Sequence, residues 1–346
     1  MKKILAMLLA LVMILSLAAC ASTPAADTPA ESTSTTETPV TETPASAEET
    51  PAADGKTYTV GVCQLVQHEA LDAATQGFVD ALTEELGGAV TIDVQNASGD
   101  SVNCGTIVNG FVSRGVDLIM ANATPALTAA VSATADIPIL GTSITVYGVA
   151  LDLDDFNGTV GGNVSGTSDL ADLQKQAQMI LDWFPETKNV GLLFCSAEPN
   201  SRYQIDEVRK ALEAQGVTCE EFAFTDSNDV SSVTQKAADF SDVVYIPTDN
   251  TAASNTEAIA NILIPAGVPA ICGEEGLCRG CGVATLSISY YDLGVTTGKM
   301  AAKILKGEAD ISEMPVEYTD ATPKYNASIC DQLGITPLDG YEAIDG

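Results

Sequence analysis

Histidine and basic side chains are scarce in this sequence. His68 is the only histidine among 346 residues, so the chain cannot build a metal site that needs a histidine pair. Lysine and arginine number 15 against 47 aspartates and glutamates, which gives a formal net charge of −32. Such an acidic balance argues against nucleic acid and anionic lipid headgroups as partners. We interpret the acidic residues, which are scattered along amphipathic segments, as a solubilising surface.

Sequence motifs of several enzyme classes are also missing. No G-x-S-x-G occurs, which argues against a hydrolase nucleophile elbow. Gly294 and Gly298 have the wrong spacing for a phosphate-binding loop, and Met300 stands where that loop needs serine or threonine. Asp152–Gly158 hints at a calcium loop, but Phe156 occupies the third ligand position, so we interpret it as a turn. We therefore expect a protein that is not an enzyme, with no catalytic residues, no metal and no cofactor.

Nine cysteines are present, and their spacing does not form two paired half-sites for zinc. Cys272, Cys278 and Cys281 are grouped, but a single C-x-x-C in an exported protein is more often a disulfide or a pair of free thiols. The sequence leaves open whether eight of the nine form disulfides: Cys63, Cys104, Cys195, Cys219, Cys272, Cys278, Cys281 and Cys330.

The chain begins with a segment that we assign to targeting. Lys2 and Lys3 precede an apolar run, Ile4–Leu17, which is short for a membrane span. The run ends Leu-Ala-Ala-Cys at Cys20, which resembles a bacterial lipoprotein signal. The resemblance implies cleavage of residues 1–19, lipidation of Cys20 and an extracytoplasmic protein anchored to the cell membrane.

Residues 20–55 are expected to form a tether. Residues 21–54 contain no lysine, arginine or aromatic side chain, and Val40 is their one large aliphatic residue. Such a composition cannot bury enough apolar area to fold, so we expect disorder.

The remaining chain predicts an α/β fold built on an internal repeat. In Lys56–Glu85 an alternating strand pattern leads through a polar loop into a helical pattern, the first half of a βαβ unit. Tyr58–Ala97 matches Asn189–Thr225 in this pattern, and Val116–Ser143 matches Ser241–Glu275. Two such halves predict two doubly wound lobes with parallel sheets. Ligands bind beyond the carboxyl ends of strands in such sheets, so we expect a cleft between the lobes.

Several segments, taken together, resemble the substrate-binding lipoproteins of ABC importers, which have the type I periplasmic-binding-protein fold. Within these proteins the chain is similar to a family with members that bind tryptophan and other aromatic amino acids. The segments that carry the resemblance are Gln64–Asp72, Ala123–Ala126, Gly166–Asp169, Tyr245–Asn250, Glu274–Gly276 and Tyr290–Leu305. The chain departs from the family pattern at Ser143–Tyr147.

The resemblance implies three crossings between the lobes, which would act as a hinge. We expect these near Gly161–Gly166, Ser287–Tyr290 and Ser312–Val316. The expected boundaries are 57–166 plus 288–312 for the first lobe and 167–287 plus 313–346 for the second.

An amino acid ligand needs donors for its carboxylate and an anion for its ammonium. Thr124 and Ser143 are candidate donors in the first lobe, although Thr124 can equally be only a helix cap. Asp249 is our candidate for the ammonium, with Glu274 or Glu275 as alternatives, and Asp249 too can be a cap. His68 lies where the cleft mouth is expected, as a ligand contact or as a surface residue. The full set of expected ligand-binding residues is Gln64, Leu65, His68, Ala123, Thr124, Thr142, Ser143, Asn200, Ser201, Thr248, Asp249, Asn250 and Glu274. Leu65, Val66 and Tyr147 are possible walls for an apolar side chain.

We therefore expect a monomeric binding component of an ABC importer, which delivers a small molecule to a permease. A sensory lipoprotein of the same fold and an extracellular hydrolase are the alternatives, and the sequence does not identify the ligand.

Overall fold

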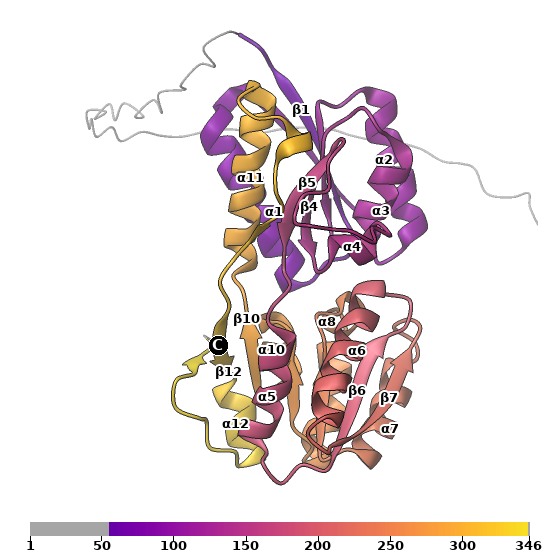
Figure 1. The fold of residues 1–346 in the computed structure, drawn as a ribbon, viewed down its shortest axis with the longest axis vertical. Helices are drawn as coiled ribbons and strands as arrows, with labels where there is room; N and C mark the ends of the chain where they lie inside the picture. Colours follow the sequence, from indigo (N-terminus) through magenta and orange to yellow (C-terminus); the bar gives the residue numbers. More distant parts are fainter. Residues whose placement is uncertain (1–54, 345–346) are drawn as a thin grey trace, which may run out of the picture. The chain divides into compact units, whose positions relative to one another are not determined.

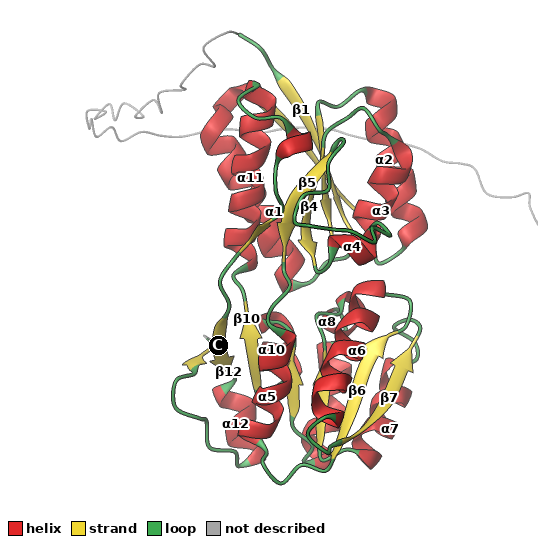
Figure 2. Ribbon diagram, viewed as in Figure 1, coloured by secondary structure: helices red, strands yellow, loops and turns green. Residues whose placement is uncertain are grey.

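The computed structural model describes residues 55–344 and contains two α/β lobes (Figures 1 and 2). The expected signal peptide, Cys20 and nearly all of the expected tether lie outside the described residues. The first lobe consists of β1 (Tyr58–Gln64), α1 (Glu69–Leu86), the 3-10 helix η1 (Gly87–Ala89), β2 (Val90–Asn96), α2 (Ser101–Arg114), β3 (Leu118–Asn122), α3 (Thr124–Ala133), β4 (Ile139–Ile144), α4 (Tyr147–Ala150), β5 (Val164–Ser168), α11 (Tyr290–Lys306), the 3-10 helix η2 (Ile311–Glu313) and β11 (Glu317–Tyr318).

The second lobe repeats this order of strands and helices. It consists of α5 (Leu173–Trp183), β6 (Asn189–Cys195), α6 (Pro199–Glu213), β7 (Thr218–Phe224), α7 (Val230–Phe240), β8 (Val243–Ile246), α8 (Asn250–Ala253), α9 (Thr256–Ala266), β9 (Ala270–Cys272), α10 (Glu275–Cys281), β10 (Ala284–Ser287), β12 (Thr322–Tyr325), α12 (Ala327–Leu333) and β13 (Glu342–Ala343).

The strand order in both sheets is that of a doubly wound fold. The first sheet runs β11-β5-β4-β3-β1-β2 and the second runs β13-β12-β10-β9-β8-β6-β7. All pairings in the first sheet are parallel, whereas β12 in the second pairs antiparallel with β10. The switch points lie between β1 and β3 and between β6 and β8, where ligand sites of this fold occur. The expected class, two doubly wound lobes, is confirmed.

Apolar strands explain why the sheets are covered on both faces. All five residues of β3 are buried, as expected for a central parallel strand between two layers of helices. In the second lobe one core cluster lies under α5 and α6, and another lies under α7, α9 and α10.

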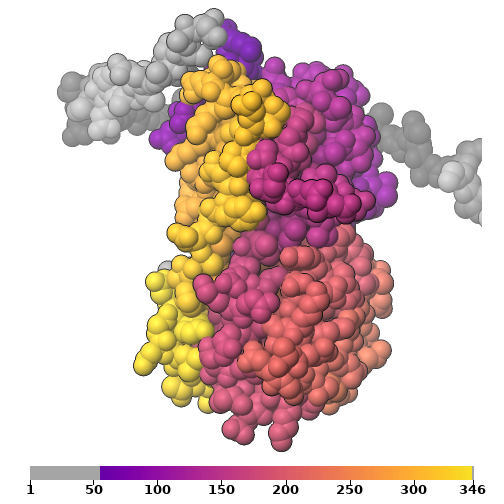
Figure 3. All heavy atoms as spheres, in the orientation of Figure 1, coloured from indigo at the N-terminus to yellow at the C-terminus, as the bar shows by residue number. Residues whose placement is uncertain are grey.

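Helix α11 returns from the second lobe to pack on α1 through glycines. A Cβ on Gly294 would lie 2.0 Å from the carbonyl oxygen of Ala74, and one on Gly77 would lie 2.1 Å from that of Tyr291. The glycines whose spacing excluded a phosphate loop are thus points of close helix contact. Figure 3 shows orange residues of α11 beside indigo and magenta residues on the first lobe, which is built from separated stretches of the chain.

The structure places two of the crossings later than we expected. The chain leaves the first lobe after β5, at residues 169–172, and Gly161 and Gly162 instead form a turn before that strand, with φ of 84° and 60°. It returns at 288–289, within the expected second crossing. The last crossing follows β11, whose pairing with β5 carries the first lobe to Tyr318. The expected boundary at 166 therefore moves to 168, where β5 ends. The one at 312 moves to 318, because β11 is an edge strand of two residues, which gives no recognisable pattern in the sequence.

Candidate functional site

A small cavity lies between the lobes at the carboxyl ends of the strands. Its volume is about 10 Å³, roughly the room for one water-sized sphere. Ser143 lies near the end of β4, and the other lining residues follow β1, β4 and β5 in the first lobe and β6, β8, β9 and β10 in the second. The full set is His68, Leu71, Ser143, Thr145, Asp169, Asn200, Thr248, Asp249, Asn250, Ala253, Glu274 and Tyr290.

Asp169 is the carboxylate in this cavity with an unused oxygen. It is 4 % exposed, and its Oδ2 accepts a hydrogen bond of 2.9 Å from the hydroxyl of Tyr290, which opens α11. Its Oδ1 is buried and has no hydrogen-bond partner within residues 55–344. Burial raises the pKa of Asp169 above its ordinary value, although hydrogen bonding from Tyr290, Thr145 and the backbone opposes this rise. Thr145 is near the carboxylate but makes no bond of hydrogen-bond geometry to Oδ1, so a ligand that brings an N–H donor would be stabilised there.

Two more buried polar atoms of the cavity lack partners in the described part of the chain. Asn200 donates from Nδ2 to the carbonyl of Thr248 at 3.1 Å, but its Oδ1 is unpaired. The Oγ of Ser143 is also unpaired. Ser143 has φ of 56° and lies at a register shift between β4 and β5. Such irregularities redirect a side chain next to a site, and here the hydroxyl belongs to a residue lining the cavity.

Asp249 uses both of its carboxylate oxygens within the protein. Oδ1 accepts from the backbone N–H of Ala252 at 2.8 Å, so Asp249 caps α8, and Oδ2 accepts from the N–H of Cys195 at 2.6 Å. Burial, and next the charge of Glu198, raises the pKa of Asp249 to about 8. Asp249 therefore has the capping role that the sequence could not separate from a ligand role, and it also lines the cavity.

Glu274 has a similar arrangement at the start of α10. Its two oxygens accept from the backbone N–H groups of Gly276 and Leu277, at 2.6 and 2.5 Å. Burial raises the pKa of Glu274 to about 7.

Glu198 is a buried residue that sequence analysis did not single out. It precedes α6 but reaches the start of α8, where it accepts from the backbone and side chain of Asn250 and from those of Thr251. Its position directly before a proline that opens a helix was the available signal.

His68 connects the two lobes. Its Nε2 lies 3.2 Å from Oδ1 of Asn250, whose Nδ2 is already engaged with Glu198. Burial lowers the pKa of His68, so the ring is neutral near pH 7. Because Oδ1 can only accept, Nε2 carries the proton, and Nδ1 is the unprotonated nitrogen.

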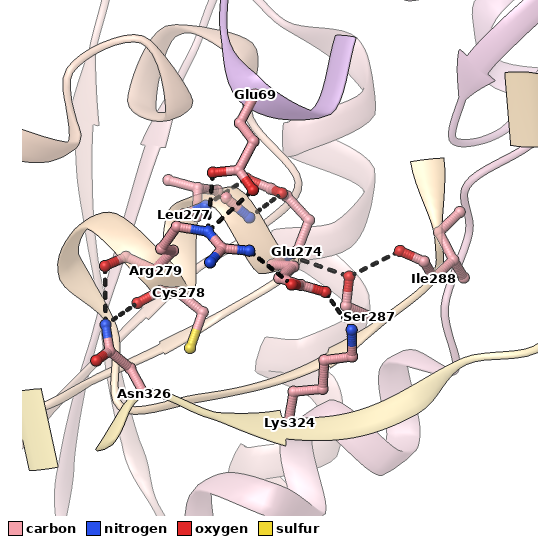
Figure 4. A network of polar contacts seen from close by, with 11 residues as sticks. Glu69, Glu274, Leu277, Cys278, Arg279, Ser287, Ile288, Lys324 and Asn326 are labelled. Atoms are coloured by element: carbon pink, nitrogen blue, oxygen red, sulfur yellow. Dashed lines mark hydrogen bonds and ion pairs between the residues drawn. The ribbon is translucent and has the colours of Figure 1, made fainter. Parts of the chain in front are cut away.

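The neighbouring Glu69 makes a second contact between the lobes. Both of its oxygens accept from Nε of Arg279 on α10, at 2.9 and 3.0 Å (Figure 4). Arg279 also donates to Glu275, which accepts from Lys324. One residue of the first lobe thus joins a chain of charges that belongs to the second.

The other expected ligand-binding residues do not line the cavity. Gln64 bonds within the first lobe, to Asp72 and Thr75, and Thr142 bonds to Thr167. Ser201 and Ala123 are fully buried, and neither lines the cavity.

Two expected residues instead line separate hollows at the lobe junction. Thr124 lies in one of about 350 Å³, and Leu65 lies with Val66 in one of about 340 Å³. Tyr147, an expected wall, belongs to the core: its hydroxyl donates to the carbonyls of Gly141 and Thr167.

Five lining residues were missing from our expected set: Leu71, Thr145, Asp169, Ala253 and Tyr290. Leu71, Asp169 and Tyr290 fall within segments that carry the family resemblance, which was the signal available for them.

All eight cysteines in the described range are free thiols. No group of three or more histidine, cysteine or acidic residues among residues 55–344 is arranged to hold a metal ion. None of the helices described has the length and apolar character needed to cross a membrane.

Comparisons with known proteins agree on one family. A family model described as ABC transporter substrate binding protein matches residues 59–340. A protein of Clostridioides difficile (strain R20291) named tyrosine-binding protein is 32 % identical over 284 residues, which cover 80 % of this chain and 81 % of that protein.

Solved structures agree with this assignment. A Streptococcus pneumoniae ABC domain in complex with L-Trp is 32 % identical, with a TM-score of 0.79, and the match covers 84 % of this chain and 100 % of that one. The ligand-free, open structure of a substrate-binding protein with adhesive properties from Clostridium difficile is 34 % identical over 84 % of this chain and 99 % of that one, but its TM-score is 0.64. At similar identity, this chain is thus closer to the structure with bound ligand.

Proposed function

Because the chain belongs to the ABC transporter substrate-binding proteins, we propose that it captures an amino acid between its lobes and delivers it to an ABC permease. The observation that supports an amino acid as the ligand is the unpaired, buried Oδ1 of Asp169 in the cavity. An ammonium group supplies both the charge and the N–H donors that this oxygen lacks. The unpaired Oδ1 of Asn200 can accept a second N–H from the same group.

The ligand's carboxylate needs a hydrogen-bond donor, and we assign it to a hydroxyl group. Ser143 has an unpaired buried Oγ in the cavity and can donate to it. We assign the ammonium to Asp169 rather than to Asp249 or Glu274, because the latter two already accept backbone N–H groups with both oxygens.

We propose that the amino acid ligand has an aromatic side chain, because two relatives of this chain are linked to such amino acids. One is named for tyrosine, and another holds L-Trp. A cavity of about 10 Å³ is far below the ~300–1,000 Å³ of typical small-molecule sites, so binding requires the lobes to separate and close again. The three crossings supply the hinge.

Titration calorimetry with matched ligands tests this proposal. L-tryptophan and L-tyrosine should bind, whereas indole-3-propionate, which keeps the ring and carboxylate of tryptophan but has no ammonium, should bind at least about thirtyfold more weakly. Equal binding of L-tryptophan and indole-3-propionate, or no binding of any amino acid, would contradict the proposal.

We also propose that Cys20, outside the described residues, carries lipid and anchors the protein, as an extracytoplasmic monomer, to the cell membrane. The motif before Cys20 supports this. Cys20→Ala should release the protein from the membrane fraction, and an unchanged membrane share would refute the lipid anchor.

A further inference from the structure

The carboxylate of Asp169 is bonded to a residue that follows a different crossing of the chain. Asp169 comes directly after β5, in the first crossing, whereas Tyr290 comes directly after the second crossing and opens α11. The hydroxyl of Tyr290 donates to Oδ2 of Asp169 at 2.9 Å, and both side chains line the cavity. Because β5 and α11 both belong to the first lobe, this bond does not depend on contacts with the second lobe.

Packing holds the ring of Tyr290 in place. The ring belongs to a buried apolar cluster that includes Ala70 and Ala74 of α1 and Leu293 of α11. These side chains meet because the glycines described above let α11 approach α1 closely. Since the interior of a protein is densely packed, the ring presents its hydroxyl to Asp169 from a fixed direction.

The hydroxyl of Tyr290 keeps its proton wherever carboxylates titrate. Burial raises the pKa of Tyr290 well above its ordinary value, and the charges of Asp169 and Glu274 act in the same direction. The tyrosine is therefore a permanent donor to Oδ2 of Asp169. A donor of this kind favours the ionised form of its carboxylate over the protonated form.

We propose that Tyr290 is a positioning residue for ligand binding: its hydroxyl occupies Oδ2 of Asp169 and leaves Oδ1 as the oxygen that binds the ligand's ammonium. The same bond keeps the carboxylate ionised, so the ammonium meets an anion and not a neutral acid. Tyr290 thus acts on the ligand through Asp169. This inference rests on the proposed function and specifies how its central carboxylate is held and kept charged.

The other titratable groups around Asp169 are the same in the parent and in a variant that lacks the tyrosine hydroxyl. Burial, and next the charge of Asp169, raises the pKa of Tyr147 on α4 well above its ordinary value, so that hydroxyl stays neutral. His68, Asp249 and Glu274 also line the cavity. Their titration affects both proteins alike, and it cancels when the two affinities are compared at each pH.

Titration calorimetry with L-tryptophan, from pH 4 to pH 8, compares the parent with Tyr290→Phe, which keeps the packed ring. The ratio of parental to variant affinity should be largest at acidic pH, at about tenfold, and should fall as the pH rises. The reason is that a hydrogen bond to a charged group is worth about tenfold or more in an equilibrium constant. Without that bond, Asp169 becomes protonated at a higher pH.

Tyr291→Phe is the matched control. Tyr291 is the next residue of α11, is 43 % exposed, and donates from its hydroxyl to Asp80 at 3.0 Å. The substitution removes a bond of the same type outside the cavity, so the affinity should equal that of the parent at every pH. In an Asp169→Asn background, which has no carboxylate to ionise, Tyr290→Phe should give no pH-dependent effect.

The outcomes separate the two proposals. If the parent binds L-tryptophan but the ratio for Tyr290→Phe is the same at every pH, or depends on pH in the Asp169→Asn background too, this inference is wrong while the proposed function stands. If the folded parent binds no amino acid, the proposed function fails and this inference fails with it. A thermal melt of each variant establishes that it is folded.

Discussion

Asp169 and Asp249 are buried aspartates that line the same cavity, but their carboxylate oxygens make different contacts. Asp169 has an oxygen left for a ligand, whereas Asp249 gives both oxygens to backbone N–H groups. Asp169→Asn should therefore weaken amino acid binding by roughly thirtyfold or more, because removing one partner of a desolvated charge pair costs about 2–5 kcal/mol. Its melting temperature should stay near that of the parent, since asparagine can still accept from Tyr290.

Asp249→Ala is the matched comparison. It removes the cap of α8, which costs about 1 kcal/mol or more of folding free energy, so its melting temperature should fall. Calorimetry on L-tryptophan and thermal melting measure both properties. If Asp169→Asn binds as tightly as the parent, the ammonium lies elsewhere.

Glu274 makes stability depend on pH. Its pKa rises from an ordinary value of 4.5 to about 7 on folding, so the folded chain holds this proton more tightly. The resulting stabilisation is complete below pH 4.5 and is lost as pH rises through 7. The free energy of unfolding of Glu274→Gln, relative to that of the parent, should therefore rise by up to about 3 kcal/mol from pH 4 to pH 8, since one pKa unit is worth about 1.4 kcal/mol.

Denaturant unfolding at pH 4, 6 and 8 measures this difference. Glu84→Gln, which removes one negative charge from an exposed position, controls for net charge. A difference between Glu274→Gln and the parent that does not change with pH would show that Glu274 is not protonated on folding.

Between elements, the start of α1 and α10 are joined by the ion pair of Glu69 and Arg279. Glu69 is 50 % exposed, so the pair contributes only about 0.2–1 kcal/mol. Because it links the two lobes, that energy favours the closed arrangement, and Glu69→Gln should speed ligand release by up to about fivefold. The effect should shrink at high salt.

Stopped-flow release of L-tryptophan provides the measurement. Glu85→Gln breaks a similar exposed ion pair, with Lys306, that lies wholly within the first lobe. If both substitutions change the release rate equally, the Glu69 pair is not a link that favours closure.

The elements themselves could be predicted because their signals are local. Periodicity in Lys56–Glu85 and its repeats gave the strand–helix units, and the doubly wound order then pointed to loops such as Thr248–Asn250. Asp169 was not selected because we expected the crossing at Gly161–Gly166, where Gly161 and Gly162 instead form a turn and Gly166 lies within β5. The capping role of Asp249 could not be separated from a ligand role, because a carboxylate at a helix start suits both.

For the whole molecule, the net negative charge of the chain does not predict the charge of the ligand that the cavity binds. The net charge of −32 belongs to the full chain, whereas the cavity presents carboxyl groups that are buried and raised in pKa. The net charge of the protein is therefore no evidence for a simple cation as the ligand. The zwitterion of an amino acid remains the best match for the unpaired atoms of Asp169, Asn200 and Ser143.

The most direct measurement is mass spectrometry of the small molecule released from protein purified under native conditions. Binding at the unpaired oxygen of Asp169 predicts an α-amino acid, with tyrosine or tryptophan foremost. The released compound should also restore, on re-addition, the melting temperature of the protein before release. Release of a sugar, a polyol or another compound without an ammonium group would contradict the account.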